Sequence, residues 1–552
     1  MARLLPSPYA LYEGRQERPR RRAGRIDRNR RATAHYRQEK RGRIFRIMFN
    51  YQNNNKMNSK QLNELLASEN HSTAIAELKN GRNATEPKAA EYIAQLDPQG
   101  HDVNDPVKRR DKKVKVDLSD FDINDEEKKN IKTVTNGDGE TENFRIEPVA
   151  RVALAIQKLI VKRAVAFTFG NPVILNAEPE EGTKEADVLK AVKRVLFDNK
   201  SRTLNRKVAR GMYSSKESAE LWYPVEKPTK NYGFDSTHKL RVAIFSPLFG
   251  DRLYPYFDET GDMVAFSREY VVKDSAGVKH TYFETYTDTE IRKWTLTSNQ
   301  WQLLDGYPKK NQIGKIPVIY GRQPAVEWED VQNLIDRLEK LLSNFADTND
   351  YHASPKIFTT GTILGWAKKG ESGAVIEGEE GATAQYLSWA QAPESVKLEI
   401  ETLLRMIYTI TQTPDIAFDS VKGIGAVSGV ALKLLFMDAH LKVQDKCEVF
   451  DDYLQRRLSV IQAFLAQMNA KDKAFVDACG SLVIEPEIVP FMIEDEAANV
   501  NLLLSATGQK AICSRKTAVQ QLGWVNDTDA EIEQIETEES AASYSSIYEP
   551  TV

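Results

Sequence analysis

The chain has 552 residues, of which 41% are hydrophobic and 28% are charged. This length and composition predict roughly three or four folding units, each with its own core. No apolar run approaches the roughly 18 residues that a membrane helix needs, and no signal peptide is recognisable. The three cysteines, Cys447, Cys479 and Cys513, are far apart, which argues for a reducing compartment and against a disulfide scaffold or a zinc knuckle.

Charge is unevenly distributed along the chain. Residues 1–47 contain fifteen Arg and Lys against four Asp and Glu, a net of +11, so the remainder carries −14 to give the total of −3. Such a basic block fits a nucleic-acid-binding arm, a solvated disordered tail, or an upstream extension that is not translated. Met48 and Met57 both suit a natural start. The sequence after Met57 is typical of a capped helix, with Asn58 or Ser59 as the N-cap.

Residues 57–147 are polar and weakly periodic, which predicts one or two helices within a linker. An apolar stripe from Val149 to Ala164 then predicts a helix that ends at Phe169-Gly-Asn-Pro172, because Gly and Pro stop helices. A strand over 173–175 and a helix over 185–199 should follow. Short strands separated by turn signals are expected between residues 219 and 297. The pattern indicates an α+β unit over 148–324 with antiparallel strands.

Long helices dominate the C-terminal half. A strand over 313–320 precedes a helix over 325–350 of about 39 Å, a glycine-rich, β-like piece over 353–389, and a second helix from Pro393 to about Thr413. A short glycine-containing loop over 417–427 leads into a helical stretch over 428–468, which would be about 60 Å long if continuous. No other segment matches that length, which favours partners in neighbouring subunits. An ordinary helical domain would show the same periodicity.

The sequence contains no recognisable catalytic or nucleotide-binding motif. GxxxxGK[ST], HExxH and GxSxG are missing, and the seven histidines have no ligand spacing. The acidic clusters 377–380 and 536–539 lie in turn-like or terminal sequence, which is typical of solvated surface rather than of a metal site. We therefore predict no enzyme activity, no metal and no cofactor.

Several segments, taken in order, resemble the portal proteins of tailed bacteriophages, of the siphophage type. The similar segments are 158–172 (ending Phe-Gly-Asn-Pro172), 316–319, 329–338, 342–347, 428–433 (Ser-Gly-Val-Ala-Leu-Lys433), 500–505, 514–518 and 527–539. They span about residues 148–540 in the family's order. The first 56 residues have no recognisable counterpart, and 57–145 match only vaguely.

This resemblance implies a portal fold that assembles as a ring, usually of about twelve subunits, around a channel that DNA crosses at one capsid vertex. The implied parts are a basic extension (1–56), an N-terminal region (57–147), a wing (148–324), two stem helices (325–352 and 390–416), a clip (353–389), a tunnel loop (417–427), a tunnel helix with its return to the wing (428–484), a crown (485–540) and a tail (541–552). The protein would be assembled in the host cytoplasm and reside in the virion.

The resemblance also implies partners and site residues. The partners are double-stranded DNA, the terminase large subunit, head-completion or adaptor proteins, and the major capsid and scaffolding proteins. The DNA-facing residues of the tunnel loop would be Val421, Lys422, Gly423, Ile424 and Gly425, followed by Ser428 and Gly429 at the start of the tunnel helix. The partner contacts of the clip would be Lys356, Trp366, Lys368 and Lys369, with Trp389, since Trp is favoured at interfaces.

Each of these assignments has a simpler alternative. Lys422 is the only charged residue in 421–425, and a solvated lysine without a DNA role fits the sequence as well as a cationic collar does. Ser428 and Gly429 also fit a plain helix cap, and the clip residues fit a core tryptophan with solvated lysines. For the whole chain, the alternative function is a nucleic-acid-binding structural protein that acts through its basic N-terminal arm.

Overall fold

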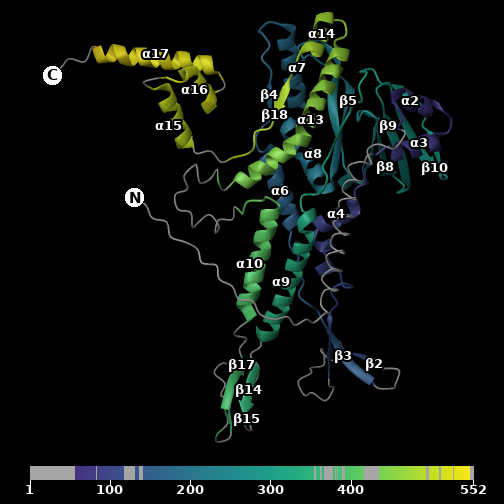
Figure 1. The fold of residues 1–552 in the computed structure, drawn as a ribbon, viewed down its shortest axis with the longest axis vertical. Helices are drawn as coiled ribbons and strands as arrows, with labels where there is room; N and C mark the ends of the chain where they lie inside the picture. The colour runs from purple at the N-terminus through teal and green to yellow at the C-terminus, as the bar shows by residue number, and fades with distance from the viewer. Residues whose placement is uncertain are drawn as a thin grey trace, which may run out of the picture.

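The chain forms an elongated α+β structure, a computed structural model shown in Figure 1. The structure describes residues 56–82, 84–116, 131–135, 141–353, 392–415, 434, 436–492, 496–508, 511–525 and 527–547, with the short stretches 356–360, 363–365, 377–378, 381 and 383–387. The predicted α+β class is confirmed, because antiparallel sheets and long helices occupy separate parts of the molecule.

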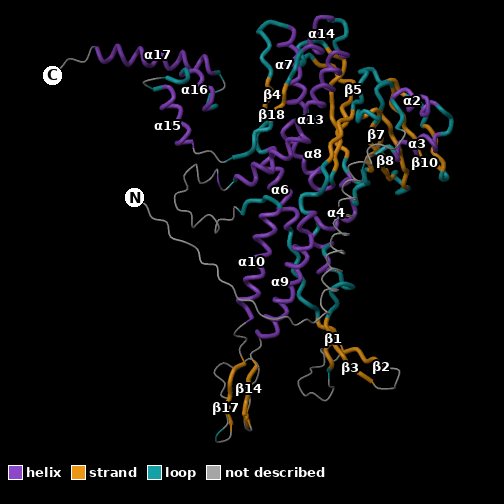
Figure 2. Tube along the Cα trace, in the orientation of Figure 1, coloured by secondary structure: helices purple, strands orange, loops and turns teal. Residues whose placement is uncertain are grey.

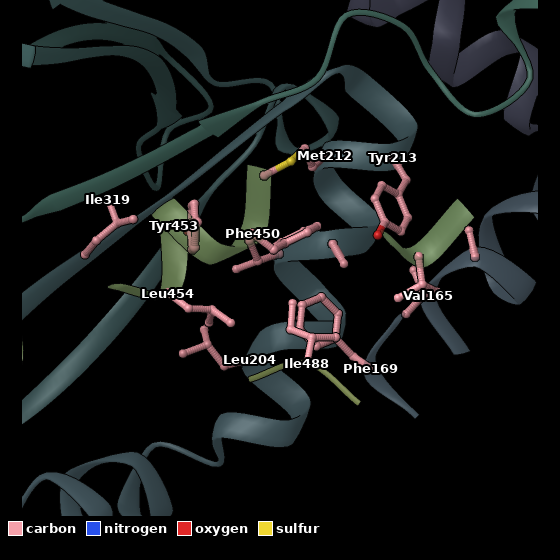
Figure 3. Close-up of a cluster of buried hydrophobic side chains, with 14 of the residues drawn as sticks. Val165, Phe169, Leu204, Met212, Tyr213, Ile319, Phe450, Tyr453, Leu454 and Ile488 are labelled. Atoms are coloured by element: carbon pink, nitrogen blue, oxygen red, sulfur yellow. The ribbon is translucent and has the colours of Figure 1, made fainter. Parts of the chain in front are cut away.

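A large hydrophobic core forms where several helices pack around the long helix α13. These helices are α6 (Ile156–Phe169), α7 (Lys184–Asp198), α8 (Ser201–Ser215), α13 (Met437–Met468) and α14 (Lys473–Ser481). Phe450 of α13 is buried in this core, where its ring meets that of Phe169 edge-on at a centroid distance of 4.9 Å (Figure 3). The helix predicted over 185–199 is confirmed as α7, whereas α8 was not predicted.

Antiparallel strands form the largest sheet, in the order β11-β10-β9-β8-β7 with β12 paired to β10. Its strands are β7 (Arg252–Phe257), β8 (Met263–Lys273), β9 (Lys279–Tyr286), β10 (Glu290–Thr297), β11 (Gln300–Leu303) and β12 (Lys309–Lys310). A second sheet has the order β13-β5-β6 and contains β5 (Glu217–Thr229), β6 (Ser236–Phe245) and β13 (Val318–Arg322). The short strands predicted between 219 and 297 are confirmed.

The sequence predicts a strand that starts at residue 313, but strand β13 begins only at Val318. The side-chain amide of Asn311 explains the late start, because it donates to the backbone oxygens of Thr287 and Lys315 at 2.7 and 2.8 Å. Asn311 is itself buried, so these bonds hold the residues before the strand in a loop.

The N-terminal residues belong to a core rather than to a linker, which corrects the prediction for 57–147. Helices α2 (Ser59–Ala67) and α3 (His71–Asn80) pack on the largest sheet, where Leu62, Leu66 and Ile75 are buried against its aromatic side chains. Asn58 is the N-cap of α2, as predicted, in a capping box with Gln61. The following elements are α4 (Ala89–Leu96), the 3-10 turns η1 (Pro98–Gly100) and η2 (Asp102–Asn104), and the sheet β1-β3-β2 with strands β1 (Lys112–Lys115), β2 (Ile131–Thr135) and β3 (Thr141–Glu147).

We expect a variant that lacks residues 1–56 to keep the melting temperature of the full chain, and a variant that lacks residues 1–80 to lose it. The longer deletion removes α2 and α3, which cover Tyr256, Phe283 and Trp294. An exposed aromatic cluster of this size promotes aggregation. Thermal unfolding with light scattering checks the expectation. Equal behaviour of the two deletions would contradict a core role for α2 and α3.

Helices α9 (Gln332–Ala353) and α10 (Ala392–Ile410) pack side by side below the central body (Figure 1). The chain between them forms the pairs β14 (Lys356–Thr360) with β17 (Thr383–Leu387), and β15 (Ile363–Gly365) with β16 (Glu377–Gly378), at the end away from the body (Figure 2). The predicted helices and the β-like piece between them are confirmed in the described residues. Helix α9, however, begins at Gln332 after the 3-10 turn η4 (Glu329–Val331), not at Ala325.

A row of hydrogen bonds, which we call the polar ladder, joins α9 to residues 148–155. The sequence predicts a helix that includes most of these residues, but they are not helical. The hydrogen bonds of the ladder run from the backbone N–H groups of Ala150, Val152 and Leu154 to Asp347 Oδ1, Ser343 Oγ and Glu339 Oε1, at 2.8, 2.9 and 2.7 Å. Acceptors four residues apart on a helix advance about 6 Å, and donors two residues apart on an extended segment advance about 6.6 Å. This match satisfies backbone donors that a helix would use internally, so α6 begins only at Ile156.

The last part of the chain leaves the central body after strand β18 (Glu485–Glu487), which pairs with β4 (Ile174–Asn176). Helices α15 (Glu496–Thr507), α16 (Arg515–Leu522) and α17 (Thr528–Ile547) then lie apart from the rest of the molecule (Figure 1). Large side chains such as Ile512 and Trp524 are mostly exposed there. Among the described helices, none combines the length and apolar character that a membrane crossing requires.

Candidate functional site

The residues predicted to face the channel lie outside the described part of the chain, but the residues on both sides of them are described. The predicted site residues outside it are Val421, Lys422, Gly423, Ile424, Gly425, Ser428, Gly429, Trp366, Lys368 and Lys369. Lys356 is the first residue of β14, in register with Leu387 of β17. After α10 the chain is described up to Asp415, and α13 begins at Met437. The candidate site is therefore the region where the end of α10 and the start of α13 flank residues 416–433.

Helix α10 ends in a tight turn that fixes where the chain leaves it. The Thr411 hydroxyl donates to Ile407 O at 2.7 Å, and the Thr413 N–H donates to Tyr408 O at 2.9 Å. Gln412 has a φ of 49°, in the left-handed region that commonly ends helices. The two threonine side chains are buried, and their hydroxyl oxygens lie 3.0 Å apart. The turn is thus held by its own polar side chains.

Lys442 of α13 reaches across to this turn. Its ammonium group donates to Thr411 O at 2.9 Å and lies 2.6 Å from the carboxylate of Glu327. Lys446, one helical turn later, lies 2.9 Å from the same carboxylate. The Glu327 side chain is 3% exposed and that of Lys442 is 10% exposed. A cation at the C-terminal end of a helix is favoured by the helix dipole, so Lys442 joins α10, α13 and residue 327 at one point.

One buried carboxylate is therefore shared between two ammonium groups. Burial alone would raise the pKa of Glu327, but Lys442 and Lys446 outweigh this effect and the pKa is lowered. Burial lowers the pKa of Lys442, and attraction to Glu327 offsets this only in part, with Lys446 adding repulsion. Loss of the Glu327 charge would leave two largely buried cations facing each other, which is strongly destabilising.

Arg163 of α6 holds the other side of the turn. Its guanidinium group donates to Pro414 O at 2.5 Å and lies 5.6 Å from the centre of the Tyr408 ring. We refer to the charged and polar groups around this turn as the loop-base cluster, which consists of Arg163, Glu327, Thr411, Lys442 and Lys446. The cluster ties the end of α10 to α6 and α13, so the chain enters residues 416–433 from a fixed point.

Sequence reasoning missed the loop-base cluster, although one signal was available. Lys442 and Lys446 are four residues apart on the side of α13 that also carries the buried Val443 and Phe450. Charged residues on an apolar face are seldom buried without partners. Their shared partner Glu327 comes from a segment more than one hundred residues earlier, and Thr411 lies 31 residues before Lys442. No local pattern links those segments.

The chemistry of the loop-base cluster is positioning by charge-assisted hydrogen bonds. Reactive thiols are not part of it, since burial raises the pKa of Cys447 to about 11 and that of Cys479 to about 12, which keeps both protonated near neutral pH. Within the described residues, no group of three or more His, Cys, Asp or Glu side chains could hold a metal ion.

Nearly the whole chain matches one known family. The family described as phage portal protein, SPP1 Gp6-like, matches residues 34–544. The chain belongs to this family. The portal protein is therefore a structural component of the virion involved in DNA packaging, and not an enzyme. Membership implies a channel for DNA packaging and ejection at a capsid vertex. Because the match begins at residue 34, the expectation that residues 1–56 have no counterpart was wrong for residues 34–56.

Solved structures of gene transfer agent (GTA) particles are similar to this portal protein. A chain of the "Neck of empty GTA particle computed with C6 symmetry" is 12% identical with a TM-score of 0.34. Chains of the "Virion of native gene transfer agent (GTA) particle" and of the "Neck of native GTA particle computed with C12 symmetry" are 11% identical, with TM-scores of 0.35 and 0.36. Each of the three matches covers 66% of this chain and 88% of the matched GTA chain. No curated protein matches this chain.

Proposed function

We propose that this portal protein assembles as a ring of about twelve subunits at one capsid vertex, and that DNA passes through its axial channel during packaging and ejection. The observation that carries the proposal is the family match over residues 34–544. The loop-base cluster supports it, because a segment in contact with moving DNA needs a fixed root. Thr411, Lys442 and Glu327 provide that root with buried, charge-assisted bonds.

We assign the parts of the ring by their order in the chain. Residues 148–324 form the wing, α9 and α10 the stem, 353–389 the clip, 417–427 the tunnel loop, 428–484 the tunnel helix with its return to the wing, and 485–540 the crown. The packing of α9 on α10, with the β14–β17 pair beyond them, supports the stem and clip assignments. In this arrangement the clip meets the terminase large subunit and later the adaptor proteins, with Lys356, Trp366, Lys368 and Lys369 as contacts.

The tunnel loop faces the DNA in this proposal, through Val421, Lys422, Gly423, Ile424 and Gly425. Each contact between a cation and a phosphate adds affinity, so a channel wall that lets DNA move can carry few of them. Lys422 repeats once per subunit and forms one thin cationic collar. The glycines on both sides of Ile424 allow backbone excursions that β-branched residues resist.

We expect Lys422→Glu to leave rings intact and to impair DNA packaging or retention, because the collar would then repel phosphate. Lys422→Arg keeps the charge and serves as the matched control. Electron microscopy with mass measurement checks the rings, and the amount of nuclease-protected DNA checks packaging. Normal packaging by Lys422→Glu would contradict the DNA-facing role of the loop. A wild-type protein that stays monomeric or dimeric would contradict the ring itself.

A further inference from the structure

Helix α8 exposes a stripe of positive charge. Arg202, Arg206, Lys207 and Arg210 are exposed on one side of α8, which contains no Asp or Glu. Among the described residues, no carboxylate forms an ion pair with any of these four, which we call the basic stripe. Arg206 donates to the backbone oxygens of Phe169 and Gly170 at 2.9 and 3.1 Å, which positions its side chain without neutralising it.

Helix α13 exposes a stripe of the opposite charge. Asp445, Glu448, Asp451 and Asp452 are exposed on the side of α13 that faces away from the core, and we call them the acidic stripe. Asp445 lies 3.7 Å from Lys446, and the other three have no cationic partner within the described part of the chain. Partial burial and the charge of Asp452 raise the pKa of Asp451, which is typical of carboxylates crowded together without a cation.

The two stripes cannot meet within one subunit. The buried sides of α8 and α13 face each other, since Arg457 donates to Asn205 and the Tyr213 ring packs on Phe450 at a centroid distance of 6.0 Å. Figure 3 shows the side chains that fill the space between the two helices, among them Leu204 and Tyr213 of α8 and Phe450 of α13. The exposed sides therefore point away from each other.

The stripes nevertheless lie at a similar level along the molecule. Helices α8 and α13 run in opposite directions, because Asn205 is beside Arg457 and Tyr213 is beside Phe450. Lys207 and Arg210 are therefore within about two helical turns, roughly 11 Å, of the level of the acidic stripe.

We propose that the basic stripe of α8 binds the acidic stripe of α13 in a second copy of this chain, and that this contact joins neighbouring subunits. The proposal rests on the proposed ring. A contact between two different surfaces of identical subunits repeats head-to-tail and closes into a ring when the rotation allows it. Complementary charge gives such a contact its direction and register, and like charge at the same place opposes it.

Replacement of two charges by the opposite charge in each stripe separately tests the contact. One variant carries Lys207→Glu with Arg210→Glu, and the other carries Glu448→Lys with Asp452→Lys; both leave the buried sides and the Arg206 bonds unchanged. Each variant alone cancels the net charge of one stripe and places like charges opposite each other at the substituted positions, so the subunit concentration for half-assembly should rise at least about tenfold, which is 1.4 kcal/mol. An equal mixture should restore rings in which the two variants alternate, because each contact then joins either two substituted stripes or two unsubstituted stripes, and opposite charges face each other in both cases.

Native mass spectrometry and electron microscopy report the rings, and circular dichroism confirms that each unassembled variant is folded like the wild-type subunit. Lys273→Glu with Lys279→Glu makes the same charge change on β8 and β9, away from both stripes, and should assemble like wild type. Assembly of either reversed variant at wild-type concentration would overturn the proposal. Folded variants whose mixture does not assemble would also overturn it.

DNA is the competing ligand of the basic stripe. If Lys207→Glu with Arg210→Glu forms normal rings but binds DNA more weakly, the stripe is a nucleic-acid surface and the subunit contact is wrong. If the wild-type protein itself forms no ring, the proposed function fails. A failure of the stripe contact alone leaves wild-type rings in place, so the two failures are distinguishable.

Discussion

Replacement of Arg457 by methionine should lower the free energy of unfolding of the subunit by about 3–5 kcal/mol. The Arg457 guanidinium group forms a two-pronged ion pair with Glu220, at 2.6 and 2.8 Å, with side chains only 3% and 0% exposed. Methionine fills a similar volume but leaves the Glu220 charge buried without its cation. Urea unfolding of the unassembled subunit measures the loss.

Two further variants show how much of the stability loss comes from burial of the charges and how much from loss of the ion pair. Arg337→Met removes an exposed pair with Glu399, whose side chains are 51% and 41% exposed, so it should cost less than about 1 kcal/mol. Adding Glu220→Gln to Arg457→Met removes the orphaned charge while keeping an acceptor for the Trp222 N–H, and should recover at least half of the loss. A double variant as unstable as Arg457→Met would show that packing, not charge, sets the effect.

Phe450→Ala should destabilise the subunit by about 3–5 kcal/mol, because it leaves a cavity in the main core. The Phe450 ring is 1% exposed and contacts the rings of Phe169, Tyr213 and Tyr453, at centroid distances of 4.9, 6.0 and 6.1 Å. It therefore holds α13 against both α6 and α8. The same urea unfolding measurement applies.

The matched control for Phe450→Ala is Phe197→Ala on α7, where the ring is 73% exposed. A change within about 0.5 kcal/mol is expected there. Phe450→Leu, which refills most of the space, should cost clearly less than Phe450→Ala. Similar losses for Phe450→Ala and Phe197→Ala would count against the central place of Phe450 in the core.

Local patterns predicted those parts of the fold whose partners are near in sequence. The strands β5 to β10 follow one another through turns, so turn signals and alternation were sufficient to find them. The pair α9 and α10 was visible in its apolar periodicity. Helix α8 had a signal that was overlooked, since Leu204, Val208 and Met212 recur every four residues and are all buried.

Distant contacts decided the parts that the sequence did not predict. The helix expected from Ala325 begins at Gln332, because Gln323 N–H donates to Lys216 O and Glu327 N–H donates to Tyr213 O, which holds this segment in another conformation. The polar composition of 57–147 suggested a linker, yet short helices need only one buried face, and α2 and α3 bury theirs on the largest sheet. The loop-base cluster likewise joins residues that no local pattern relates.

The polar ladder between α9 and residues 150–154 has a mechanical consequence. Its hydrogen bonds lie one after another along the axis of α9, with matched spacing on both sides. A force along the axis of α9 loads all of these hydrogen bonds together in shear. A force perpendicular to that axis would break them one after another. Helix α9 is therefore held most firmly against sliding along its own length.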